Sequence, residues 1–258
     1  FFIRYFSVSY CLAFIFLCMG DIWSYAAAII TIIGCIIAIF EFVFYKEFID
    51  ILCKKTDGYN ISGNINPQNK IKQIVIISGH YDSPYVFSFL NKYQKLYKFR
   101  VILNTFLYFL ITVVSILVVW SSLVYNSNYY LPPSLLIILG VGVFFMSQYF
   151  FFISWEVSPG AGDNLVSAAM VVKLSELFSK RESMHSSLQH TKLIFLCPDA
   201  EESGLRGARE YVKKHFKELT SYPTYNINMD SIYRLQDLRF LKSEINGCIK
   251  LDKKLNNK

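Results

Sequence analysis

Four long apolar runs restrict what this sequence can fold into. They are Phe1–Gly20, Ile22–Tyr45, Phe99–Tyr125 and Leu131–Phe152, and they raise the hydrophobic share of the chain to 53%. Each run has about the 20 residues that an α-helix needs to cross the hydrocarbon core of a bilayer. We therefore predict four transmembrane helices, of which the first has the shortest apolar run.

Aromatic residues near the ends of these runs support membrane insertion, because Trp and Tyr gather at membrane–water interfaces. They are Trp23, Tyr25, Trp120, Tyr125, Tyr129, Tyr130 and Trp155. The alternatives are buried core helices or a secretory signal peptide. A signal peptide has one apolar segment before a cleavage site with small residues, whereas this chain has four runs. The pattern favours an integral, multi-pass membrane protein in contact with a lipid bilayer.

The distribution of basic residues predicts the orientation of these spans. Basic residues flank the spans on one side only: Arg4, Lys46, Lys54, Lys55, Lys92, Lys95, Lys98 and Arg100. The turns at 20–21 and 125–130 contain no Lys or Arg. By the positive-inside rule, the segments that carry these basic residues, and the polar parts of the chain that adjoin them, lie in the cytoplasm. The net charge of +7 suits an anionic inner leaflet. No recognised nucleic-acid-binding motif accompanies it, so no nucleic-acid partner is predicted.

The polar part of the chain contains a strand that leads into two adjacent carboxylates. The apolar run Leu193–Cys197 is followed by Glu201 and Glu202, and then by a glycine and a helix-compatible segment. Neighbouring like charges repel unless a positive group holds them. A divalent metal would do so, with one carboxylate as a ligand and the other handling protons. The alternative is a solvated pair at a helix start, where the helix dipole favours negative charge.

Three further segments deliver groups of the kind that bind metals, although each has an ordinary explanation when taken alone. His80 follows the apolar run Ile74–Ile77, and Asp82 lies on the same side of an extended chain, where it could fix the tautomer of His80. Asp163 opens a helix and could be an N-cap, and Asp230 ends another strand. Because open α/β sheets carry their functional crevice at the carboxyl ends of the strands, the four segments together indicate one metal site.

These motifs resemble the co-catalytic zinc aminopeptidases of metallopeptidase family twenty-eight. The family pattern is a strand ending His-x-Asp-Ser, then Gly-Ala-x-Asp-Asn, then Glu-Glu-x-Gly-Leu-x-Gly-Ser/Ala, then a strand ending in Asp. In the same order this sequence has His80–Ser83, Gly160–Asn164, Glu201–Ala208 and Asp230. The resemblance covers Tyr59–Pro84 and Ser158–Tyr233.

The resemblance implies an α/β fold, a three-layer sandwich with a mixed, mainly parallel sheet, to which four transmembrane helices are added. We expect strands near Tyr59–Ile65, Gln73–Ser78, Lys192–Leu196 and Thr224–Met229, and helices near Asn164–Ser179 and Gly204–Glu218. The predicted parts are an N-terminal membrane helix pair (1–45), a first peptidase part (46–98), an inserted transmembrane hairpin (99–155) and a second peptidase part (156–258). An even number of spans leaves both peptidase parts on one face of the membrane.

The resemblance also implies a role for each site residue. His80 and Asp230 would bind one Zn²⁺, Glu202 would bind a second, and Asp163 would bridge the two. On the catalytic side, Glu201 would be the general base, and Asp82 would orient His80. The implied activity is that of a zinc-dependent exopeptidase, an aminopeptidase that removes N-terminal residues from a peptide substrate through a metal-activated water.

One ligand of the family pattern has no counterpart here. The family supplies a final His to the second metal from a later segment, whereas the nearest histidines precede Asp230: His185, His190 and His215. We therefore expect the chain to be a fragment that lacks the C-terminal part. Two other functions stay open, namely a glutaminyl-cyclase-like acyltransferase with a single zinc and a non-catalytic membrane scaffold. The cyclases tend to have Ser where this chain has Asn164.

Overall fold

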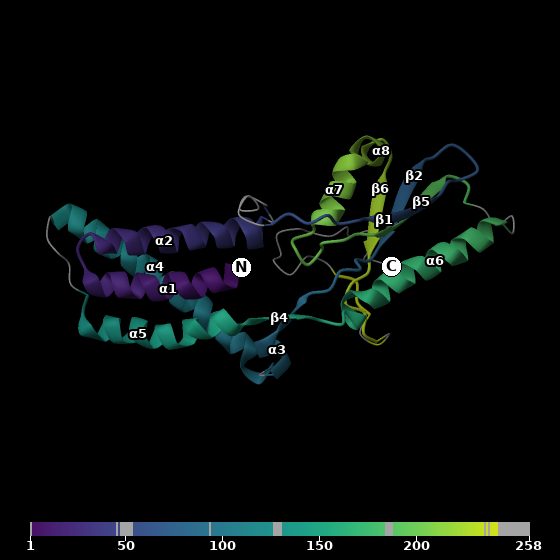
Figure 1. Ribbon diagram of the computed structural model, residues 1–258. Helices are drawn as coiled ribbons and strands as arrows, with labels where there is room; N and C mark the ends of the chain where they lie inside the picture. Colours follow the sequence, from purple (N-terminus) through teal and green to yellow (C-terminus); the bar gives the residue numbers. More distant parts are fainter. Residues whose placement is uncertain are drawn as a thin grey trace. The chain divides into compact units, whose positions relative to one another are not determined.

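The protein, in a computed structural model, forms two compact units (Figure 1). Its described residues are 2–44, 46, 54–92, 94–125, 131–183, 188–234, 236 and 238–241. One unit, here the helical unit, consists of Phe1–Leu52 and Tyr85–Glu156. The other, here the sheet unit, consists of Cys53–Pro84 and Val157–Lys258. Residues 126–130 of the predicted turn and the residues after Leu241 lie outside the described residues.

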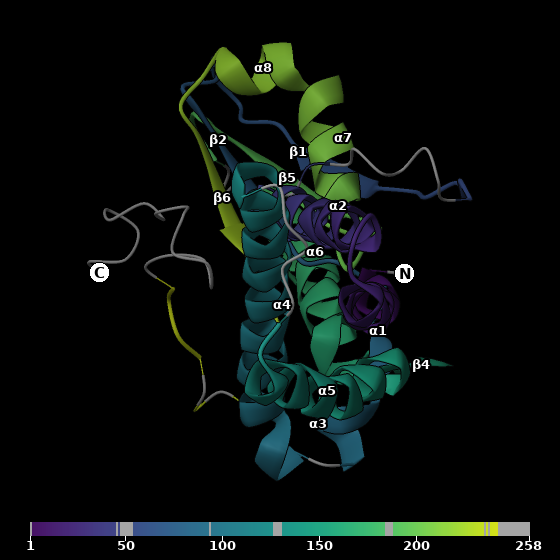
Figure 2. The same cartoon turned by 90° about the vertical axis from the view of Figure 1, so that its left-hand side faces the viewer.

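Four apolar helices pack around a common core in the helical unit. They are α1 (Phe2–Met19), α2 (Trp23–Ala38), α4 (Tyr97–Tyr125) and α5 (Pro133–Ser147). Figures 1 and 2 show that α4 crosses α1 and α2 obliquely. The core includes Tyr10, Ala13, Leu17, Ala27, Leu107, Ile111, Leu139 and Met146. Large apolar side chains also cover the outside of the helices, among them Ile29, Ile102, Phe109 and Ile137. Helices that are apolar all round are typical of membrane spans.

Short elements extend and connect these helices. They are η1 (Ile39–Val43), β3 (Tyr85–Phe87), α3 (Ser88–Lys92), η3 (Gln94–Leu96), η4 (Gln148–Phe151) and β4 (Ile153–Val157). Strands β3 and β4 pair with each other.

Three helices are long and apolar enough to cross a membrane, namely Trp23–Glu41, Gln94–Tyr125 and Pro133–Phe151. The remaining apolar helix, Ile3–Met19, is shorter. The described residues therefore provide three candidate spans where the sequence predicted four, and a span in the first run stays a prediction.

Two glycines allow tyrosine side chains to enter the helix contacts. The Tyr10 hydroxyl on α1 donates a hydrogen bond to the Leu139 carbonyl on α5, at 3.1 Å. A Cβ atom on Gly142 would lie 2.0 Å from the oxygen of that hydroxyl, and one on Gly34 of α2 would lie 2.0 Å from the hydroxyl oxygen of Tyr108 on α4. Small residues at such positions let membrane helices approach closely.

The sheet unit contains four strands in the order β1-β5-β2-β6. Their bounds are β1 (Ile61–Ile65), β2 (Gln73–Ser78), β5 (Thr191–Cys197) and β6 (Thr224–Asn228). Strand β1 is antiparallel to β5, whereas β2 is parallel to both β5 and β6. The prediction of a mixed, mainly parallel sheet is confirmed, and each observed strand overlaps the predicted one.

Helices cover both faces of this sheet (Figure 1). On one face Leu193 and Phe195 of β5 pack with α6 (Val166–Ser183), and on the other Ile194 and Leu196 pack with residues of α7 (Arg206–Lys214) and α8 (Phe216–Thr220). A strand buried on both faces is apolar at consecutive positions, which explains the continuous apolar run of β5. The three-layer description of the complete domain stays a prediction.

The helix predicted at Gly204–Glu218 is wrong in detail, because two short helices occupy this range. Gly204 and Leu205 have φ angles of +100° and +62°, so the right-handed helix begins only at Arg206. It is interrupted at His215, whose backbone is not helical.

Replacing Gly142 by Ala is expected to destabilise the helical unit by about 1–3 kcal/mol, because overpacking of a closed core costs that much. The Tyr10 ring is fully buried and has no room to move away. Gly140→Ala is the matched control, since a Cβ there would lie 3.3 Å from the tip of the Phe14 ring. The measurement is thermal unfolding of both purified variants in detergent. Equal unfolding temperatures would contradict the close contact at Gly142.

Candidate metal centre

The three parallel strands of the sheet end at the same level. Ser78, the last residue of β2, pairs with Leu196 of β5 and with Asn228 of β6. The segments that follow these three strand ends carry His80, the Glu201–Glu202 pair and Asp230, respectively. Sheet register alone therefore delivers an imidazole and three carboxylates to one edge of the sheet.

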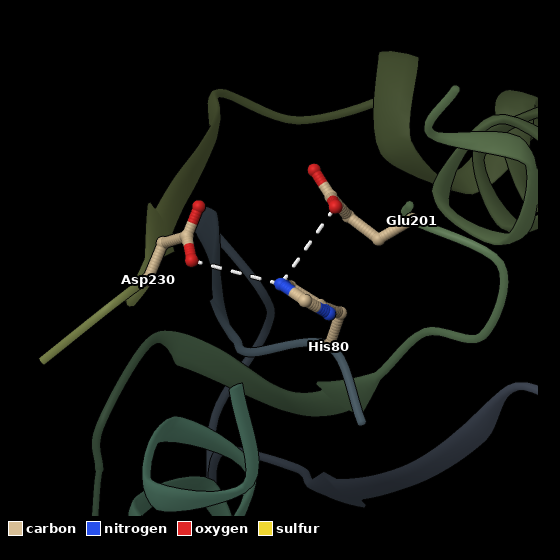
Figure 3. A group of neighbouring side chains, drawn as sticks. All are labelled: His80, Glu201 and Asp230. Carbon is tan, nitrogen blue, oxygen red and sulfur yellow. Dashed lines mark ion pairs between the residues drawn. The ribbon is translucent and has the colours of Figure 1, made fainter. Parts of the chain in front are cut away.

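The side chains meet around the Nε2 atom of His80. This nitrogen lies 3.7 Å from Glu201 Oε2 and 3.6 Å from Asp230 Oδ1 (Figure 3). It also lies 3.4 Å from Oδ1 of Asp163, which comes from the segment η5 (Ala161–Leu165) in front of α6. The structure thus brings together residues that are up to 150 positions apart in the chain.

Two sets of three side chains among the described residues could hold a metal ion. One set is His80, Glu201 and Asp230, and the other is His80, Asp163 and Glu202. Within each set the candidate ligand atoms all lie within 4.8 Å of one another. The sets contain every metal ligand predicted from the sequence, and Glu201 lies among them although it was predicted to be the base. His80 is the only residue that both sets share.

Asp82 contacts the His80 ring and the backbone of both glutamates. Its Oδ1 atom lies 3.2 Å from His80 Nδ1 and accepts the backbone N–H of Glu201 at 3.1 Å. Its Oδ2 atom accepts the backbone N–H of Glu202 at 3.1 Å. A proton on Nδ1 that points to Asp82 leaves the Nε2 lone pair for a metal. Asp82 therefore contacts both His80 and the chain that carries the two glutamates, and its orienting role stays a prediction.

The carboxylates make His80 strongly basic. Burial disfavours the charged imidazolium, but hydrogen bonding to Asp230 and Asp82 and the charge of Glu201 outweigh it and raise the pKa of His80 to about 10. The ring itself is only 2% exposed. A buried imidazole among so many acceptors is electrostatically suited to a positive charge at Nε2.

The carboxylates also repel one another. Partial burial, and then the charges of Asp163 and Glu201, raise the pKa of Glu202 to about 7. Burial and the nearby Asp230 raise the pKa of Asp163, and burial is the largest cause of the raised pKa of Glu201. A cation between these groups would keep them ionised. An imidazole nitrogen with carboxylate oxygens is a ligand set that Zn²⁺ accepts, so the residues present fit this metal.

Asn164 fixes the Asp163 segment against the end of β6. Its side chain is fully buried. The amide nitrogen donates to the Met229 carbonyl at 3.0 Å, and the amide oxygen accepts the Ser231 N–H at 3.2 Å. Asp230 is therefore held on both sides by the residue that follows Asp163. The sequence had distinguished Asn164 only as a peptidase-like feature, because its contacts depend on the fold.

A second hydrogen-bonded network holds the loop that carries the glutamates. Asn60 donates from its amide nitrogen to the Gly207 carbonyl at 2.7 Å and accepts the Asp199 N–H at 3.1 Å. The Asp199 carboxylate accepts the Tyr59 N–H at 3.0 Å. These contacts connect the residues before β1 to both ends of the loop. Sequence reasoning missed Asn60 and Asp199, and the only available signal was an Asn before one strand and an Asp after another.

Glycine at position 160 is required by the turn that leads to Asp163. Gly160 has a φ of +66°, in the left-handed region that favours glycine. A Cβ atom there would also lie 2.1 Å from the Ser83 hydroxyl oxygen. The glycine of one predicted motif and the serine of another are thus in direct contact.

A comparison with known families agrees with this geometry. The family model described as Peptidase family M28 matches residues 152–254, a range that contains Asp163, Glu201, Glu202 and Asp230. No curated protein and no solved structure gives a significant match. Family M28 is the metallopeptidase family twenty-eight whose motifs the sequence resembles, and His80 and Asp82 of the same pattern lie at the centre of the site, outside the matched range. Residues 152–254 thus match peptidase family M28, a family of zinc-dependent metallopeptidases.

Proposed function

We propose that the protein is a membrane-anchored zinc aminopeptidase, which hydrolyses the first peptide bond of a peptide substrate. One observation carries this proposal, namely the convergence of His80, Asp163, Glu201, Glu202 and Asp230 at the ends of three parallel strands. The family assignment supports a zinc-dependent peptidase. The preference for a free amino end comes from the resemblance to the aminopeptidases of the family.

Two zinc ions are part of the proposal. His80 and Asp230 would hold one ion, Glu202 would hold the other, and Asp163 would contribute to both. Bound zinc would polarise the peptide carbonyl and lower the pKa of water to about 7. The Asp82 carboxylate contributes by keeping the His80 ring in one orientation, with Nε2 toward the carboxylates.

Glu201 is the proposed general base. It is partly buried, and burial raises the pKa of its carboxyl group. A carboxylate whose pKa is raised is a stronger proton acceptor than an ordinary one, which suits it to act as a general base. Glu201 takes the proton from the attacking water and gives it to the amine that leaves.

The loop network makes the position of Glu201 depend on Asn60. The loop is anchored by Asp82 through the N–H groups of Glu201 and Glu202, and by Asn60 through residues at its two ends. Substituting a residue that orients the ligands of a metal typically lowers metal affinity or activity 10- to 100-fold.

We also propose that the catalytic groups face the cytoplasm. The residues around α3 and the start of α4 include Lys92, Lys95, Lys98 and Arg100. The opposite end of α4 and the whole of α5 contain no basic residue. The positive-inside rule assigns the basic ends, which adjoin the sheet unit in the chain, to the cytoplasmic side.

Substituting Glu201 by Gln is expected to retain zinc and to lower turnover at least about 100-fold, as loss of a general base does. Asp163→Ala is expected to lose both zinc and activity, because it removes the group between the two ions. Zinc content is measured by mass spectrometry and turnover with a peptide that has a free amino end. Glu176→Gln, at an exposed position of α6, is the matched control. Equal zinc loss in Glu201→Gln and Asp163→Ala would make Glu201 a ligand instead.

The same assay distinguishes the amino-end preference from the alternatives. An N-acetylated copy of the peptide is expected to resist hydrolysis, and equal cleavage of both peptides would contradict an aminopeptidase. Cyclisation of a peptide with N-terminal Gln, without hydrolysis, would favour the acyltransferase alternative.

Asn60→Ala is expected to reduce kcat about 10-fold or more, since it releases both ends of the glutamate loop. Asn64→Ala provides the control, because Asn64 is an exposed residue of the same edge strand, β1. The kinetic constants and zinc content of both variants are compared. A change of the same size in both would show that the edge strand in general, and not the Asn60 contact, is responsible.

Single cysteines at positions 127 and 186 are expected to report the topology, although both lie outside the described residues. After the native thiols are replaced, an impermeant thiol reagent on intact cells should label position 127 and spare 186, because no metal site forms across about 30 Å of hydrocarbon. The reverse pattern would place the catalytic groups outside the cell. Labelling of both would contradict the predicted membrane hairpin.

A further inference from the structure

Helix α7 presents an apolar stripe on the surface of the sheet unit. Tyr211 points into the core and is buried, whereas Val212 and Phe216 expose 46% and 59% of their surface. Leu205, just before the helix, and Ala208 line the same groove as Val212 and as Phe216, which begins α8. Together these residues line an open groove of about 700 Å³.

Basic side chains border this stripe. Arg209 and Lys213 line the groove beside the apolar residues. The segment 205–220 also contains the basic residues Arg206, Lys214 and Lys217, against the two acidic residues Glu210 and Glu218. Glu218 pairs with Lys192, which lies in β5. The segment 205–220 therefore carries five basic and two acidic residues, an excess of positive charge.

We propose that this groove, formed by α7 with the flanking Leu205 and Phe216 and here called the Leu205–Phe216 stripe, docks on an anionic membrane surface. An apolar stripe bordered by Arg and Lys is the composition of helices that lie in the membrane interface. The apolar side chains would enter the headgroup region, and Arg209 and Lys213 would meet lipid phosphates. This inference rests on the membrane anchoring proposed above and is independent of the catalytic chemistry.

Chain continuity favours a membrane over a soluble partner. The sheet unit is covalently joined to the helical unit at three places, near residues 52–53, 84–85 and 156–157. If the apolar helices span a bilayer, the sheet unit is tethered to that bilayer, and docking of the stripe is an intramolecular event. A small surface is then sufficient, whereas stable binding of a separate protein usually buries more than about 1,000 Å².

Helix α6 offers an internal control with the same residue pair. Val172 is 59% exposed, and the neighbouring Lys173 pairs with Glu176 three residues later. On α7, Val212 is followed by Lys213, which pairs with Glu210 three residues earlier, at 3.1 Å. Helix α6 covers the other face of the sheet. The two Val–Lys pairs thus share chemistry and exposure but lie on opposite faces of one unit.

The test uses the full chain with its native cysteines replaced and a single cysteine at position 212 or 172. Each variant carries a nitrobenzoxadiazole label and is reconstituted into nanodiscs that contain lipids spin-labelled in the headgroup region. The nanodiscs contain phosphatidylcholine alone or mixed with phosphatidylserine. Quenching at position 212 is expected to increase at least about twofold with phosphatidylserine, and quenching at 172 to stay unchanged.

Charge-removing variants test the contribution of the basic residues. Lys213→Gln should reduce the quenching at position 212 in the anionic nanodiscs, and added salt should do the same, because it screens charges at the surface. Lys173→Gln should have no effect. Zinc content and peptidase activity are measured in the same samples.

Three outcomes would overturn the inference. Equal quenching at positions 212 and 172 would show no preferred face. If quenching at 212 is the same with and without phosphatidylserine, an anionic surface is not the partner. If the label at 212 is not quenched at all, another part of the chain or another protein covers the stripe. Flotation with vesicles separates the proposals: a chain that does not float loses the membrane anchoring as well, whereas one that floats without quenching loses this inference alone.

Discussion

The Asp82 carboxylate is the contact on which the site depends. One of its oxygens faces His80 Nδ1 and the N–H of Glu201, and the other accepts the N–H of Glu202. The orientation of the imidazole and the course of the glutamate loop are therefore set by one side chain. An ionised carboxylate accepts hydrogen bonds but donates none. The imidazole and the loop backbone together supply the hydrogen-bond partners of Asp82. The pKa of Asp82 is lowered accordingly, because contacts with His80 and with the two backbone N–H groups outweigh burial.

The sheet explains how a long insertion is compatible with this site. The chain leaves the sheet unit at Pro84 and returns to it at Val157. The Ser158 N–H donates to the Pro84 carbonyl at 2.8 Å, so the two ends of the insertion meet. An insertion whose ends are close adds a separate body without changing the register of the strands around it. The apolar helices α4 and α5 therefore enter between the His80 and Asp163 motifs while both motifs stay in one site.

The sequence predicted the parts of the site that depend on strand ends. Apolar runs such as Leu193–Cys197 indicate buried strands, and the groups that follow parallel strands must meet at one edge of a sheet. Other parts depend on pairings that no local pattern contains. Asn60 meets Asp199 only because β1 is antiparallel to β5, with Ile61 opposite Cys197. The break between α7 and α8 likewise follows from local backbone conformation at His215 and not from periodicity.

Charge at the site couples metal binding to the stability of the fold. The pKa of Glu202 rises from an ordinary 4.5 to about 7 in the folded protein without metal, so in this interval the folded state binds more protons than the unfolded state. Stability without metal must therefore fall as pH rises from 4.5 toward 7, since the unfolded state releases its proton more readily. The raised pKa values of Asp163 and Glu201 act in the same direction. A cation between these groups reverses the effect, because it favours the ionised carboxylates. At neutral pH a bound cation would thus stabilise the arrangement that His80 and Asp82 hold together, so metal binding and the stability of the fold would be coupled.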